Sequence, residues 1–132
     1  MPNPENAMEW VAFARKDHEE AVLLKAHGFD PDRIAIHLQQ MMEKSLKALL
    51  VWNRRSVPRV HDLTMLLQEV GEMLEETERY ARSCARLSQL YFTARYPMPV
   101  PIEVSVDDVV RMMADAEALY QEVEALISKT KD

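Results

Sequence analysis

Glycine is scarce in this sequence, with only two among 132 residues. Folds rich in strands need many tight turns, and glycine supplies backbone conformations that such turns require. The commonest residues are instead leucine, alanine, methionine, glutamate, lysine and arginine, which favour helices. The sequence therefore indicates an all-α protein with long helices and few connections.

Cysteine is also scarce, since Cys84 is the one thiol and no disulfide can form within the chain. Its apolar, periodic surroundings predict a buried thiol. No apolar run approaches the roughly 20 residues of a membrane span, and the amino end shows no secretory segment. We expect one domain over residues 1–132, located in the cytoplasm and not in a membrane.

Several functional motifs are missing as well. There is no glycine-rich phosphate loop and no Gly-x-Ser-x-Gly elbow. The four histidines lack the His-x-x-x-His and Glu-x-x-His spacings that commonly mark metal sites on helices, so we expect neither a metal nor a cofactor. A formal net charge of −6 disfavours RNA as a partner, although a local basic patch remains compatible with it.

Apolar spacing and helix-ending residues predict five helices. Gly28 is suited to end the first, Asp30 and Pro31 to begin the second, and Pro97 to end the fourth. We predict an antiparallel up-and-down bundle of four long helices and a short one. The predicted ranges are Glu5–His27, Pro31–Asn53, His61 to near Gly71 or into 72–77, Thr77–Arg95, and a last helix capped by Ser105 that reaches about Ile127.

The stretch Gln39–Trp52 has the strongest helical pattern in the chain. It contains neither glycine nor proline, and its apolar residues recur at steps of three and four. We expect this helix to lie inside the bundle, with its polar residues at the flanks. Among these, Glu43 and Lys44 are about 100° apart and cannot act as one pair, whereas Glu43 and Lys47 have the spacing of a simple surface pair.

Asp17 is unusual because it falls on the apolar stripe of the first helix. A buried carboxylate needs a partner, so Asp17 is either paired or at the edge of the stripe in water. His61 and Asp62 open the third helix, where either could be a cap or a contact to a nucleotide or partner. Tyr91 and Tyr96 are better suited to the core or an interface than to stacking on a ligand.

Arg95 is the strongest single candidate for a functional residue. Its guanidinium always carries a charge and binds carboxylate or phosphate through a fork of donors. Two interpretations remain open: an internal pair with Glu43 or Asp17, or a contact to a nucleotide phosphate. The full set of candidates is Asp17, Glu43, Lys44, His61, Asp62, Arg95 and Tyr96.

Four stretches together resemble the HEPN domain family (higher eukaryotes and prokaryotes nucleotide-binding). They are Trp10 with Ala14 and Asp17, then 39–48, His61-Asp62-Leu63, and 91–97. The resemblance implies a helical bundle that is commonly a homodimer. Stand-alone prokaryotic members often pair with a minimal nucleotidyltransferase, and some such pairs resemble toxin–antitoxin modules.

Other HEPN members are metal-independent ribonucleases with an Arg, four to six residues, and a His near the start of a late helix. No His follows Arg95 at that spacing. Arg55 and His61 fit the spacing but lie in the wrong place for the family, so we interpret that match as coincidence. The departure argues against an enzyme. We expect the chain to pair with a minimal nucleotidyltransferase. One alternative is a divergent ribonuclease toxin that uses Arg95 and His61. Another is a stand-alone nucleotide-binding module.

Overall fold

The computed structural model describes residues 4–93, 97 and 103–129, and within these ranges the chain is helical with no strand. This confirms the expectation of an all-α bundle with four long helices and a short one. The helices are α1 (Pro4–Ala26), α2 (Pro31–Trp52), α3 (Leu63–Val70), the 3₁₀ turn η1 (Gly71–Met73), α4 (Thr77–Thr93) and α5 (Val106–Ser128).

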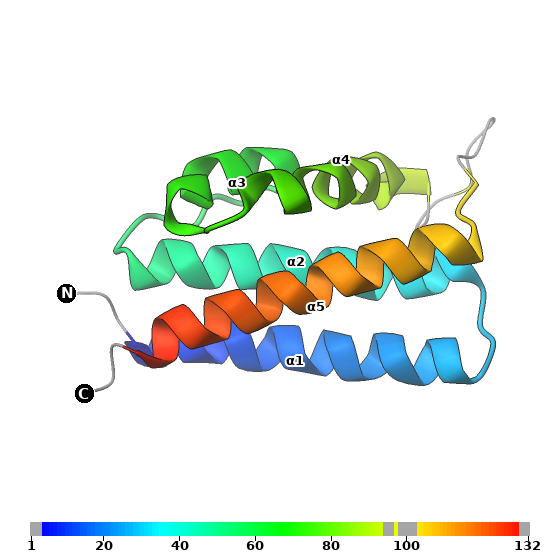
Figure 1. The fold of residues 1–132 in the computed structure, drawn as a ribbon, viewed down its shortest axis with the longest axis horizontal. Coiled ribbons are helices and arrows are strands. Elements are labelled where there is room, and N and C mark those ends of the chain that lie inside the picture. Colours follow the sequence, from blue (N-terminus) through cyan, green and yellow to red (C-terminus); the bar gives the residue numbers. More distant parts are fainter. Residues whose placement is uncertain (1–3, 94–96, 98–102, 130–132) are drawn as a thin grey trace.

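Helix α2 is the central element of the bundle. It packs against each of the other α-helices, with α1 along one side, α3 and α4 together on the other, and α5 crossing both α1 and α2 (Figure 1). Helices α1 and α2 run antiparallel, as their short connection predicts. The stretch Gln39–Trp52 is buried at most of its positions, which explains why its apolar pattern is the clearest in the sequence.

The helix ends follow local chemistry closely. Gly28 has a φ of 70° just after α1, a left-handed conformation that glycine adopts without strain. Asp62 caps α3 by accepting hydrogen bonds from two backbone N–H groups. Ser105 and Asp108 form a reciprocal capping box at the start of α5. Asp30 occupies the N-cap position of α2, but its side chain accepts no capping hydrogen bond there.

One hydrophobic core joins the helices, and Cys84 lies within it. The prediction of a buried thiol is confirmed, and burial raises the pKa of Cys84 to about 12. Such a thiol stays protonated at neutral pH and is a poor nucleophile. Within the described ranges, none of the helices combines the length and apolar character needed to cross a bilayer.

Candidate functional site

Four of the five predicted site residues that the structure describes fall into two polar clusters, and the fifth, Asp62, caps a helix. The Glu43 cluster consists of Gln39, Glu43, Lys47, His61 and Tyr91, where α2 meets the start of α3 and the last turns of α4. The Asp17 cluster consists of Asp17, Glu20, His37 and Lys44, between α1 and α2. Arg95 and Tyr96 lie outside the described residues, so their predicted roles stay untested.

Glu43 is the centre of the first cluster and is almost fully buried. Its Oε1 lies 2.8 Å from Gln39 Nε2 and 2.9 Å from His61 Nδ1, and its Oε2 lies 2.9 Å from Lys47 Nζ. The side chains of Lys47 and Glu43 are only 7% and 6% exposed. The prediction of a surface pair was therefore wrong, because Trp10 of α1 lies against Lys47 and His61 lies against Glu43.

The environment of Glu43 favours its charged form. Burial alone would raise the pKa of this carboxyl, but the hydrogen bonds from Lys47, His61 and Gln39 outweigh burial and lower the pKa below its ordinary value. An ionised carboxylate can only accept hydrogen bonds. Nδ1 of His61 must therefore carry a proton, which leaves Nε2 as the ring nitrogen not involved in this bond.

The His61 ring is held on two sides. Glu43 fixes one nitrogen, and the Tyr91 ring stacks on the imidazole with centroids 4.6 Å apart and planes 15° from parallel. The His61 side chain is nevertheless 50% exposed. A half-exposed imidazole held by a buried carboxylate presents its other ring nitrogen to a ligand or partner in a fixed direction.

Asp62 has a different role from its neighbour. Its Oδ1 lies 2.9 Å from the backbone nitrogen of Thr64 and 3.3 Å from that of Met65, the geometry of an N-cap. The sequence predicted that either His61 or Asp62 caps α3. Asp62 is the cap, whereas the His61 side chain contacts Glu43 on α2.

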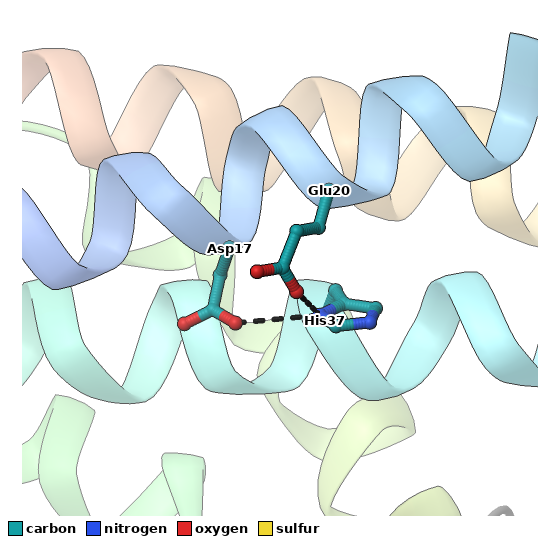
Figure 2. A group of neighbouring side chains, drawn as sticks. All are labelled: Asp17, Glu20 and His37. Atoms are coloured by element: carbon teal, nitrogen blue, oxygen red, sulfur yellow. Dashed lines mark hydrogen bonds and ion pairs between the residues drawn. The ribbon is translucent and has the colours of Figure 1, made fainter.

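The Asp17 cluster fastens α1 to α2. Lys44 Nζ lies 2.5 Å from Asp17 Oδ2. His37 Nδ1 lies 3.3 Å from Asp17 Oδ1 and 3.0 Å from Glu20 Oε2 (Figure 2). Asp17 is therefore both buried and paired, which decides between the two interpretations of this carboxylate. Lys44 and Glu43 belong to separate clusters, as their angular separation on α2 predicts.

Glu20 and His37 were not predicted as part of any site. Asp17 and Glu20 are three positions apart on one helix, and Glu20 and His37 lie at nearly equal distances from the turn at Gly28. Aligning the two antiparallel helices about that turn would have brought Glu20 opposite His37. Metal-ligand motifs such as Glu-x-x-His lie within one helix, so they do not reveal a pair of residues on two different helices.

Arg55 and His61 do not act together, although their spacing fits the ribonuclease motif. Arg55 binds the backbone oxygen of Glu69 and, at 2.9 Å, the carboxylate of Glu72. Glu69 lies in the last turn of α3 and Glu72 in η1 just after it, whereas His61 precedes the start of α3. The two side chains therefore reach opposite ends of this helix.

A shallow hollow of about 280 Å³ lies between α4 and α5. Arg82, Arg86 and Arg111 line it together with Asp108 and Asp115. Arg86 and Arg111 are both paired with Asp108, at 3.4 and 2.8 Å. Although the chain has a formal net charge of −6, three arginines therefore line this one hollow.

The sequence and the fold are both similar to those of known proteins. The family model described as the HEPN domain matches residues 7–126. The crystal structure of TT1696 from Thermus thermophilus is 23% identical, with a TM-score of 0.78 over 95% of this chain and 98% of that chain. The structure of ST0689, an archaeal HEPN homologue, is 22% identical, with a TM-score of 0.69 over 92% and 97% of the two chains.

The search of curated proteins gave no significant match. At these identities the two solved structures establish a likeness of fold only, whereas the family model spans most of the sequence. Its match includes the Trp10, Gln39, His61 and Tyr91 regions that carry the resemblance in sequence. This chain belongs to the HEPN domain family.

Proposed function

We propose that this chain is the HEPN member of a pair with a minimal nucleotidyltransferase, and that it acts as a homodimer. The observation that carries the proposal is the half-exposed His61 ring, held by buried Glu43 and stacked on Tyr91. Membership in the HEPN family and the missing His after Arg95 support a binding role over ribonuclease activity. Such a pair is a candidate toxin–antitoxin-like module.

The Glu43 cluster suits recognition because its orientation is set before a partner arrives. Ordering a free side chain at an interface costs about 0.5–1.5 kcal/mol, and a ring held on two sides avoids most of that cost. Arg95 and Tyr96 follow Tyr91 closely in sequence and remain candidates for the same surface. Asp17 and Lys44, which bind each other across α1 and α2, are assigned a structural role in this proposal.

The test is co-expression of the tagged chain with minimal nucleotidyltransferases from its own genome. We expect one of them to co-purify, and His61→Ala to weaken its retention at least tenfold. His27→Ala, at the exposed end of α1, is the matched control and should leave retention unchanged. The proposal fails if the wild-type chain retains none of these nucleotidyltransferases.

A divergent ribonuclease is the second candidate, favoured by the Glu43–His61 arrangement. His61 Nε2 would take the proton of a ribose 2′-hydroxyl, whose oxygen would then attack the adjacent phosphorus and expel the 5′-oxygen. Water would protonate the leaving 5′-oxygen, and Arg55, which binds Glu72, takes no part in this step. Growth arrest on expression that disappears in both Arg95→Ala and His61→Ala would favour this candidate. Expression without arrest, together with intact bulk RNA, would dismiss it.

A stand-alone nucleotide-binding module is a third candidate, and the hollow between α4 and α5 favours it. Guanidinium groups bind phosphate through paired donors, and Arg82, Arg86 and Arg111 border this hollow. Calorimetry with a panel of nucleotides tests the idea, with Arg82→Ala as the variant. Dissociation constants weaker than about 1 mM would dismiss it.

A further inference from the structure

We propose that Asp17, Glu20 and His37 form a binding site for a divalent transition-metal ion between α1 and α2. The two carboxylates come from neighbouring turns of α1, and one ring nitrogen of His37, on α2, contacts both of them (Figure 2). One ligand atom from each residue lies within 4.8 Å of the others. This site is separate from the Glu43 cluster and does not depend on the function proposed above.

The two separations between His37 Nδ1 and the carboxylate oxygens match those between ligands of one bound ion. Zinc bonds to imidazole nitrogen and carboxylate oxygen are about 2.0–2.2 Å long. Two such ligands at right or tetrahedral angles are therefore about 2.8–3.6 Å apart. His37 Nδ1 lies 3.3 Å from Asp17 Oδ1 and 3.0 Å from Glu20 Oε2. An ion that replaces the proton at Nδ1 would therefore keep both separations from His37 within the range for one metal site.

The donor set indicates which kind of ion would bind. One imidazole and two carboxylates suit zinc and its first-row neighbours, whereas magnesium and calcium prefer oxygen ligands alone. Three protein ligands also leave one tetrahedral position for water or another ligand. We therefore expect zinc to bind more tightly than magnesium.

The surroundings support the three ligands. Lys44 holds Oδ2 of Asp17, an outer hydrogen bond of the kind that orients ligating carboxylates. With His37 neutral, two carboxylates and one ammonium leave a net charge of −1, which attracts a divalent cation. Asp17 is nearly buried, whereas the Glu20 side chain is 57% exposed and provides an open side for entry.

The chain offers a matched control in His18, which pairs across α1 and α5 with Glu117 at 2.6 Å. This is also a histidine–carboxylate pair on the bundle surface, but a second carboxylate does not complete a three-ligand group there among the described residues. Substituting His18 therefore removes an imidazole and an ion pair without touching the proposed ligands.

The experiment is calorimetric titration of the metal-free full chain with Zn²⁺, and with Co²⁺ followed by visible absorption. We expect one Zn²⁺ per chain and Co²⁺ bands that report a nitrogen- and oxygen-ligated ion. His37→Gln and Glu20→Gln should each weaken Zn²⁺ binding at least tenfold, whereas His18→Gln should bind as the wild type does. Magnesium should not compete at equal concentration.

Circular dichroism identifies any variant that fails to fold, and Glu20→Gln provides the folded case because its side chain is largely exposed. Absence of saturable Zn²⁺ binding to the wild type would overturn the proposal. So would full affinity in folded His37→Gln and Glu20→Gln, or an equal loss in His18→Gln.

Discussion

Glu43 and Lys44 are neighbours in the chain, yet they belong to two clusters of opposite character. Around Glu43, a carboxylate and an ammonium are both buried and their hydrogen bonds come from α2 itself and from His61. Around Asp17, a buried carboxylate meets a partly exposed lysine and histidine and the exposed Glu20. The first cluster is covered by Trp10 of α1 and by His61, and the second is open to solvent at Glu20 on α1.

The two clusters therefore differ in role: buried charged groups stabilise the fold, whereas exposed charged groups can also bind a ligand. A closed ion pair that loses one member leaves a buried charge without compensation. An open pair that loses a member exposes the remaining group to water, which solvates it. We expect substitutions in the Glu43 cluster to lower stability strongly, except at His61, its exposed member. We expect substitutions in the Asp17 cluster to cost less, and its side chains to be able to bind a metal ion in place of one another.

The largest predicted effect is that of Glu43→Ala. The buried Lys47 side chain would lose its carboxylate partner, so the free energy of unfolding should fall by about 3–5 kcal/mol. Urea unfolding measures this loss. Glu72→Ala, which breaks the exposed pair with Arg55, is the control and should cost about 0.2–1 kcal/mol. Equal losses in the two variants would remove the distinction between closed and open clusters.

Asp17→Ala should have an intermediate effect. Lys44 and His37 would lose a hydrogen-bonding partner, but both side chains already reach water in part. The expected loss in the free energy of unfolding is about 1–3 kcal/mol, again by urea unfolding. A loss as large as that of Glu43→Ala would show that the Asp17 cluster is also closed.

Asp62→Ala should cost less, because its main contribution is the cap of α3. Loss of an N-cap side chain typically costs about 1 kcal/mol, and Asp62→Asn should retain most of that contribution. Thermal unfolding of both variants measures the difference. If Asp62→Asn were as unstable as Asp62→Ala, the cap would not account for this residue.

The smallest predicted effect is a difference in pH dependence between the wild type and Glu43→Gln. The pKa of Glu43 is lowered in the folded chain, so its charged form adds stability above its unfolded value of about 4.5. That contribution is lost as the pH falls below about 4.5 and through the folded pKa. The stability gap between the two proteins should therefore narrow in acid, as measured by urea unfolding. A gap that widens in acid would contradict a lowered pKa.

Most of the fold could be predicted from local sequence signals. Gly28, Pro31 and Ser105 act through the conformation of their own backbone or of the next turn, so their effects are visible without tertiary structure. The helical period of Gln39–Trp52 likewise identified the central helix. These features depend on residues within a few positions of one another.

The candidate site could be predicted only in part, because its contacts join distant residues. The four-residue spacing of Glu43 and Lys47 is compatible with either an exposed or a buried pair. Which of the two forms depends on the residues that other parts of the chain place over it, namely Trp10 and His61. The partners of Asp17 depend on how α1 aligns with α2. Sequence spacing identified His61 and Asp62 as candidates but did not distinguish the cap from the residue that turns to Glu43.

The central claim is that His61 is the accessible, functional edge of an otherwise structural cluster. Its most direct test is to measure unfolding and nucleotidyltransferase retention together in His61→Asn. We predict a stability loss of about 1 kcal/mol or less, since Gln39 and Lys47 still satisfy Glu43, with at least a tenfold loss of retention. Unchanged retention, or a stability loss equal to that of Glu43→Ala, would contradict the claim.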